Sequence, residues 1–346
     1  MKGESAVGPG LDPVYPSLTD HLAGAGKPPD DQIRFVLAVC SAYAYGDVRT
    51  VATIMDRLGL TRNRCRMVSE YVDALFLTST AFLIQSHDRR VAILCYRGTP
   101  PTSAITWLTD FEVEPVAIRV PALSPEARVH GGFYRNVRST RFKIVELLQD
   151  ALAGRSVLDS TTNLEDEPPA HDLEALYVTG HSLGGASAAL LGALLVAEPV
   201  RYGAITPETP ARILERLKAV YTYGQPMIGN PGFAIACDGL LGDKVIRYVY
   251  ANDVVPQVPP KASGSFQHFG QEYRYTPAGE HGRWNPSRPR RQLHDLRQLA
   301  TAPLAIVAKS LRLTRDVPFR ASLADHLPQY YLDALTPDHL RSEFGD

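Results

Sequence analysis

The chain has 346 residues, 45% of them hydrophobic and 21% charged, and a net charge of -1. This composition is that of a folded globular protein. It excludes a disordered, collagen-like or coiled-coil chain, and the near-neutral charge excludes a general attraction to nucleic acid.

The N-terminal part gives the first expectations. Residues 1–29 are rich in proline and glycine and are predicted to form a flexible arm before one domain over residues 30–346. Residues 1–20 lack the apolar run of a secretory signal, so a cytoplasmic protein is expected, peripheral to a membrane at most. The cysteines have no metal-ligand spacing and are predicted to be reduced, without a metal or other cofactor: Cys40, Cys65, Cys95 and Cys237.

The middle of the chain alternates strand and helix patterns. Asp30 and Asp31 precede an amphipathic helix pattern, and the apolar runs 81–84 and 91–96 flank a short polar linker typical of a hairpin. Further strands are predicted over 116–120, 175–179, 219–223, 244–250 and 272–275, and helices over 133–152, 183–197 and 323–335. This alternation predicts an α/β fold with a mostly parallel central sheet, helices on both faces and an antiparallel start.

Two segments depart from the average composition. Residues 155–174 carry six acidic side chains against one arginine and are predicted to be a solvated polar insert. Residues 279–320 are basic, with nine Lys and Arg from Arg283 onward, and apolar residues from Leu293 to Leu311 recur at helical spacing. This basic insert is predicted to be helical. It is either an interfacial helix that contacts an anionic membrane or a helix that docks on its own protein.

The strongest chemical signal is Gly180-His181-Ser182-Leu183-Gly184-Gly185, between an apolar strand and an Ala- and Leu-rich helix. A serine nucleophile on such a turn needs glycine two residues before and two residues after it, because a side chain there would collide with the backbone. Gly180 and Gly184 meet this need. Ser182 is therefore the predicted nucleophile.

A serine hydroxyl needs a base, and the base needs an orienting carboxylate. Asp253 follows the 244–250 strand and is the predicted acid, although it could also serve as a turn-capping residue before Pro256. Five histidines come after Asp253. Of these we choose His326 as the base, because it starts an apolar segment that can return to the sheet, and the alternatives are His268, His281, His294 and His339.

Together these residues resemble the class 3 lipases, which include the fungal triacylglycerol lipases, within the α/β-hydrolase fold. The matching pieces occur in order from about residue 80 to residue 336. They are Arg97-Gly98-Thr99, Trp107-Leu108-Thr109-Asp110, His130-Gly131-Gly132-Phe133, Gly180 to Gly185, Tyr223-Gly224-Gln225-Pro226 with Gly229-Asn230, Asn252 to Pro256, and Asp325-His326 with Tyr330.

The resemblance implies the same triad of Ser182, Asp253 and His326, and it adds an oxyanion hole and a lid. Leu183, whose N–H follows the nucleophile, and Thr99 are the implied donors of the oxyanion hole. The short segment after Thr99 is the implied lid. We expect Ile105 and Trp107 to cover the acyl pocket, with a core anchor as the alternative role of Trp107.

These observations predict a serine carboxylic ester hydrolase that acts on acylglycerols or other fatty acyl esters and works in lipid degradation without a cofactor. The alternatives are a phospholipase or acyl thioesterase, because the same triad serves any activated acyl group, and a non-catalytic scaffold of the same fold. Its expected partners are a lipid or small acyl-ester substrate and an anionic membrane surface at residues 283–320, with no nucleic acid.

Overall fold

The computed structural model of the chain describes residues 4–6, 12–72, 77–99, 114–120, 122–158, 171–197, 209–278, 282–290 and 322–342. Its helices and strands are, in chain order, β1 (Glu4–Ala6), α1 (Leu18–Gly24), α2 (Asp31–Tyr43), α3 (Val48–Leu58), β2 (Arg64–Val72), β3 (Leu77–Gln85), β4 (Val91–Tyr96), β5 (Pro115–Ala117), β6 (Arg128–His130), α5 (Gly131–Leu152), β7 (Ala175–His181), α6 (Leu183–Ala197), α7 (Thr209–Arg216), β8 (Leu217–Tyr223), α8 (Pro231–Leu241), β9 (Val245–Val249), β10 (Gln271–Thr276), β11 (Arg283–Ser287) and α11 (Pro328–Leu335). Short 3-10 turns lie at Val255–Gln257, Lys261–Ser263 and Ala324–His326.

The centre of the structure is a nine-stranded sheet in the order β1-β2-β3-β4-β7-β8-β9-β10-β11. The five strands from β4 to β10 run parallel, and antiparallel strands flank them at both edges. The hairpin predicted from the sequence is confirmed, because β3 pairs with β4 from Ala81–Tyr96 to Gln85–Ala92. Strands β5 and β6 pair with each other in a separate small sheet.

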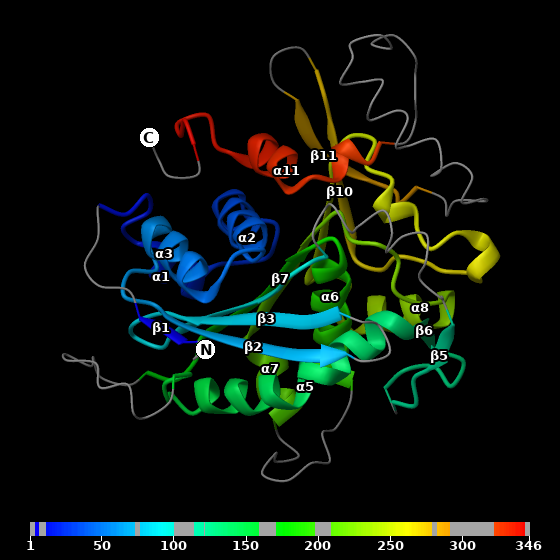
Figure 1. Cartoon of the computed structure of the whole chain (residues 1–346), viewed down its shortest axis with the longest axis horizontal. Helices are drawn as coiled ribbons and strands as arrows, with labels where there is room; N and C mark the ends of the chain where they lie inside the picture. The colour runs from blue at the N-terminus through cyan, green and yellow to red at the C-terminus, as the bar shows by residue number, and fades with distance from the viewer. Residues whose placement is uncertain are drawn as a thin grey trace.

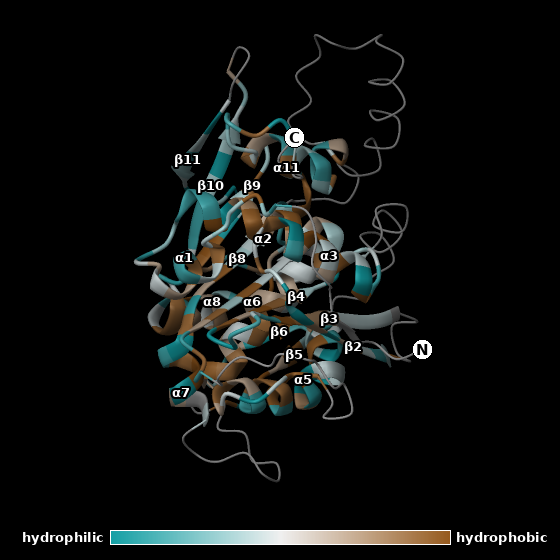
Figure 2. Ribbon diagram, turned by 90° about the vertical axis from the view of Figure 1, so that its left-hand side faces the viewer, coloured by the Kyte–Doolittle hydropathy of each residue, from teal (hydrophilic) through white to brown (hydrophobic). Residues whose placement is uncertain are grey.

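Helices cover both faces of this sheet, as predicted (Figure 1). Helices α1, α2, α3 and α11 pack on one face, and α5, α6, α7 and α8 pack on the other. Each face of the sheet therefore has its own hydrophobic core, and successive side chains of a strand point to opposite faces. In β4, Ile93 points into the core with α1, α2, α3 and α11, and Leu94 points into the core with α5 to α8. In Figure 2 the apolar residues accordingly gather where the sheet meets the helices.

Local signals in the sequence account for where several helices begin. The Asp30 carboxylate accepts the Ile33 N–H at the start of α2, and Asn230 accepts the Phe233 N–H at the start of α8. The charge-free stretch 176–197 is strand β7 and the buried helix α6, joined at Ser182. Among the described helices, none is both long enough and apolar enough to cross a bilayer.

The predicted flexible arm over residues 1–29 is wrong for residues 4–6, which form β1 and pair with β2, and for residues 12–29. Leu18 and Leu22 are one helical turn apart in α1 and are fully buried, and the Leu22 carbonyl accepts a hydrogen bond of 2.8 Å from the Tyr177 hydroxyl. The burial of these two leucines against the sheet outweighs the proline and glycine content that suggested an arm.

The two predicted inserts also differ from expectation where the structure describes them. In the basic insert 279–320, residues 283–287 are strand β11 and not helix, because they pair with β10 and add a strand to the sheet edge. The helical pattern at 291–320 lies outside the described residues. In the acidic insert 155–174, Val157 and Leu173 are buried rather than solvated, and Glu174 forms an ion pair with Arg90.

Candidate active site

The nucleophile turn lies between β7 and α6, where a parallel strand passes directly into a helix. Ser182 has a φ of 61°, in the left-handed region that costs a residue with a side chain about 1–3 kcal/mol. A Cβ on Gly180 would lie 2.4 Å from the Gly184 backbone, and a Cβ on Gly184 would lie 2.3 Å from the Tyr96 carbonyl. The two glycines therefore allow the close packing that the turn requires.

The structure brings the three predicted triad residues together, although 144 residues separate Ser182 from His326. The Ser182 hydroxyl lies 2.8 Å from His326 Nε2, and His326 Nδ1 lies 2.8 Å from Asp253 Oδ2. Because a carboxylate can only accept, Nδ1 carries the proton and Nε2 is free to accept the serine proton. This is the tautomer that a general base needs.

Asp253 is completely buried and receives further hydrogen bonds beside that of the histidine. The Tyr331 hydroxyl donates to Oδ2 over 2.6 Å, and the Val255 N–H donates to Oδ1 over 2.9 Å. Gly224 has a φ of 61°, and a Cβ there would lie 2.9 Å from both Asp253 and His326. Both carboxylate oxygens are thus hydrogen-bonded, and there is no room beside them for a larger residue at position 224.

The backbone of His326 is tied to the nucleophile turn through His181. His181 Nε2 donates to the His326 carbonyl over 2.8 Å, and its Nδ1 accepts from the Tyr45 hydroxyl over 2.8 Å. Burial, and next the neighbouring His326, hold the pKa of His181 well below its usual range. A neutral His181 adds no second positive charge beside His326 when His326 is protonated.

The two predicted oxyanion-hole residues are Thr99, which follows strand β4, and Leu183, which directly follows Ser182. A Cβ on Gly98 would lie 2.6 Å from the His181 carbonyl, so the strand end before Thr99 runs directly against this turn. The Thr99 hydroxyl is buried and has no hydrogen-bond partner among the described residues. Leu183 is the first residue of α6, where a helix leaves its N–H groups unpaired. The Leu183 N–H is therefore an available donor directly after Ser182, and Thr99 carries an unpaired hydroxyl one residue after the contact of Gly98 with this turn.

The other histidines weighed for the base do not reach Ser182 where the structure describes them. His268 is buried and bonded to the Pro256 carbonyl over 2.7 Å, and burial lowers its pKa to about 3. His339 lies after α11 in the C-terminal turn, on the exposed side. His281, His294 and the lid residues Ile105 and Trp107 lie outside the described residues.

Tyr331, Tyr45 and His181 are the site residues that the sequence did not single out. Tyr330, which matched a lipase motif, stacks on Tyr250 at 5.7 Å, and the next residue, Tyr331, contacts Asp253. No local pattern distinguishes the two tyrosines in the sequence, because the contact of Tyr331 with Asp253 joins residues 78 positions apart. Within the described residues no group of three or more His, Cys, Asp or Glu side chains could hold a metal ion.

Comparison with known proteins gives a consistent family. Residues 93–263 match the family described as Lipase (class 3). The chain is 27% identical to the triacylglycerol lipase OBL1 of Arabidopsis thaliana over 289 residues, which cover 73% of this chain and 53% of the relative. It is 30% identical to a lipase of Rhizopus niveus over 206 residues, which cover 58% of this chain and 42% of the relative. The chain spans about half the length of these curated relatives.

Solved structures agree on the fold. A triacylglycerol lipase described as having a serine protease triad as its catalytic centre superposes with a TM-score of 0.56 at 23% identity, over 87% of this chain and 95% of the other. The triacylglyceride lipase of Rhizomucor miehei superposes with a TM-score of 0.55 at 22% identity, over the same fractions. The predicted α/β-hydrolase fold and the resemblance to the class 3 lipases are confirmed.

Proposed function

Residues 93–263 of this chain are a class 3 lipase region within an α/β-hydrolase fold, and from this premise we propose that the protein is a serine carboxylic ester hydrolase. Its substrates are acylglycerols or other fatty acyl esters. The observation that carries the proposal is the unbroken chain of two 2.8 Å contacts from Ser182 through His326 to the buried Asp253.

The proposed reaction follows from this chain of contacts. Ser182 Oγ attacks the ester carbonyl while His326 Nε2 takes its proton, and Asp253 stabilises the imidazolium that forms. The negative charge on the former carbonyl oxygen is stabilised by the Leu183 N–H and by Thr99. His326 then gives its proton to the leaving alcohol, which leaves an acyl-enzyme on Ser182. Water, activated by His326, hydrolyses this acyl-enzyme and restores the serine.

Labelling with a fluorophosphonate tests this proposal, because the reagent reacts only with an activated serine. We expect one labelled residue, Ser182, in the wild type and none in Ser182→Ala. Hydrolysis rates on a triacylglycerol emulsion, a phosphatidylcholine vesicle and an acyl thioester then rank the substrate classes. An unlabelled, folded wild type would instead assign the chain to the non-catalytic scaffolds of this fold.

A prediction for the oxyanion hole rests on the unpartnered hydroxyl of Thr99. Thr99→Val keeps the shape and the backbone N–H but removes the hydroxyl. We expect it to lower kcat about 10²-fold with little change in KM, because the lost donor acts mainly on the transition state. Steady-state kinetics on a soluble short-chain ester measure this, with Thr99→Ser as the control that restores the donor. Wild-type kcat in Thr99→Val would leave the Leu183 N–H as the donor and remove the Thr99 hydroxyl from the hole.

We also propose that the basic segment 283–320 attracts the protein to anionic lipid. Arg283 and Arg288 are exposed on and beside β11, at the start of this segment. Each cation near an anionic surface contributes about 1 kcal/mol, so vesicles with phosphatidylserine should sediment more protein than vesicles of phosphatidylcholine alone. The difference should shrink as salt rises, since salt shortens the Debye length. Equal binding to both vesicles at every salt concentration would contradict the proposal.

A further inference from the structure

The turn between β9 and Asp253 is strained. Ala251 has a φ of 37°, in the left-handed region that favours glycine, and it is only 8% exposed. A non-glycine residue keeps such a conformation only where its surroundings hold it there. Because Ala251 lies two residues before Asp253, the conformation of this turn sets the direction in which the carboxylate leaves the backbone.

Side chains from distant parts of the chain hold this turn. Arg274 Nη1 donates to the Ala251 carbonyl over 3.1 Å, and Asp325 Oδ2 accepts the Asn252 N–H over 3.0 Å. The Ser322 N–H donates to the Asn252 carbonyl over 2.8 Å. Asp325 and Ser322 belong to the segment that carries His326. Of these side chains, Arg274 on β10 is the one that hydrogen-bonds to the strained residue itself.

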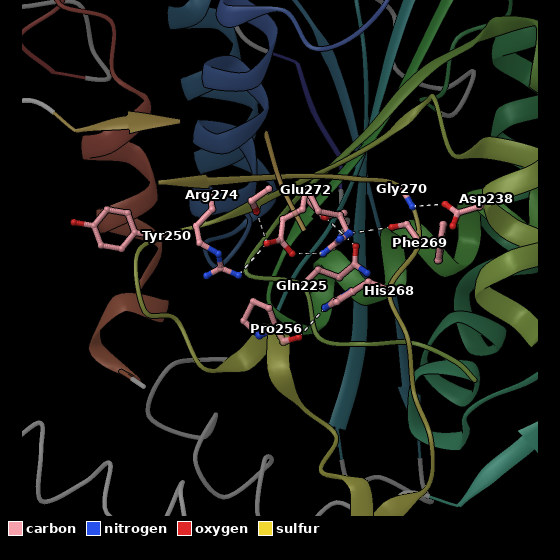
Figure 3. A network of polar contacts seen from close by, with 12 residues as sticks. Gln225, Asp238, Tyr250, Pro256, His268, Phe269, Gly270, Glu272 and Arg274 are labelled. Carbon is pink, nitrogen blue, oxygen red and sulfur yellow. Dashed lines mark hydrogen bonds and ion pairs between the residues drawn. The ribbon is translucent and has the colours of Figure 1, made fainter. Parts of the chain in front are cut away.

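Arg274 is in turn fixed in a buried ionic cluster (Figure 3). Its Nη2 lies 3.0 Å from Glu272 Oε1, and the Glu272 carboxylate also lies 3.1 Å from Arg247 Nη1 and 2.7 Å from the Ser287 hydroxyl. Burial raises the pKa of Glu272, but Arg247 and Arg274 outweigh it and leave this pKa below its ordinary value. Glu272 is therefore ionised at neutral pH and orients the Arg274 guanidinium toward the turn.

Because of this cluster, the effect of Arg274 on the turn can be tested without leaving Glu272 unpaired. Without Arg274, Glu272 keeps its contacts with Arg247 and Ser287, so no buried charge is left unpaired. The Ala251 carbonyl, in contrast, loses the hydrogen bond from Arg274. Substitution of Arg274 therefore weakens the strained turn at Ala251 more than it weakens the sheet around Glu272.

We propose that Arg274 is a positioning residue of the active site: it holds the strained Ala251 turn so that Asp253 meets His326 Nδ1. This inference rests on the proposed ester hydrolase function for its kinetic consequence. The chemistry is a charge-assisted hydrogen bond from a guanidinium to one carbonyl, which compensates for a backbone conformation that alanine disfavours. Removal of Arg274 lets the turn relax and moves the carboxylate away from the histidine.

The strain gives the proposal a specific rescue test. Arg274→Met removes the hydrogen bond to the Ala251 carbonyl. We expect kcat on a soluble short-chain ester to fall at least tenfold while KM stays within twofold. Ala251→Gly removes the strain, since glycine adopts a positive φ readily. We therefore expect the double variant Arg274→Met with Ala251→Gly to recover to within threefold of Ala251→Gly alone. A merely structural role of Arg274 would not be rescued in this way.

Two further variants guard against loss of the fold. Arg49→Met removes an exposed arginine from helix α3 and should leave kcat unchanged. Arg274→Lys keeps a positive charge beside Glu272 but lacks the second planar donor that reaches Ala251, so it should also lose kcat and be rescued by Ala251→Gly. Full activity of Arg274→Met, or a double variant as slow as Arg274→Met, would overturn the proposal.

A crystal structure of Arg274→Met separates this inference from the proposed function. We expect Ala251 to return to a negative φ and Asp253 Oδ2 to leave the 2.8 Å contact with His326 Nδ1, and both to be restored in the double variant. An unchanged turn in Arg274→Met would overturn the inference even if the wild type hydrolyses esters. A wild type that resists fluorophosphonate would overturn the proposed function, while these structures still decide what holds the turn.

Discussion

Replacing Ser182 or His326 by alanine is expected to lower kcat/KM for ester hydrolysis by about 10⁴- to 10⁶-fold, with similar losses in the two variants. The losses are similar because the residues act as one unit through the 2.8 Å contact between Ser182 Oγ and His326 Nε2. Without His326 the nucleophile has no base, and without Ser182 the base has no nucleophile to activate. The double variant should be no slower than the slower single variant. Steady-state kinetics on a soluble short-chain ester measure all three.

Controls for this prediction come from histidines to which no catalytic role is assigned. His171→Ala changes an exposed residue, and His281→Ala and His294→Ala remove two of the four other histidines weighed as the base. All three should remain close to wild-type activity. Near-normal turnover in a folded Ser182→Ala or His326→Ala would contradict the assignment of the triad, and a large loss in His294→Ala would reopen the choice of base.

The sequence predicted the nucleophile turn and the strands around it because both depend on short-range patterns. Glycine two residues before and two residues after Ser182 is a local steric requirement, and the apolar runs of β4, β7, β8 and β9 reflect strands buried on both faces. Asp253 could be proposed because it follows a predicted strand. The chain order of the triad then limited the histidines to five.

The residues that hold the triad could not be predicted, because their contacts join distant parts of the chain. Tyr45 reaches His181 across 136 residues, and Tyr331 reaches Asp253 across 78. No spacing rule connects such pairs, and each side chain alone resembles an ordinary core tyrosine. Strand β11 was mistaken for helix for a related reason: it becomes a strand only because β10 offers it a free edge.

Asp253→Asn is expected to lower kcat by about 10⁴-fold although the side chain keeps its size, and the hydrogen bonds around it explain why. The Val255 N–H donates to Oδ1, so an asparagine NH₂ group at that position would face another donor. The NH₂ group therefore takes the Oδ2 position, beside His326 Nδ1 and the Tyr331 hydroxyl. The tyrosine hydroxyl can rotate to accept, but His326 must move its proton to Nε2 to accept from the amide. Nε2 then points a proton at Ser182 and cannot take one from it.

Two substitutions of Asp253 distinguish the effect of the His326 tautomer from the effect of the Asp253 charge. If charge alone mattered, Asp253→Ala and Asp253→Asn would lose similar activity, because both remove the carboxylate. If the tautomer matters, Asp253→Asn should be the slower of the two, since alanine leaves Nδ1 free to keep its proton, with water able to accept from it. Asp243→Asn, at an exposed position just before β9, is the matched control and should be silent. An Asp253→Asn variant within tenfold of the wild type would show that His326 takes the serine proton without an orienting carboxylate, because the contact with His181 already holds its backbone.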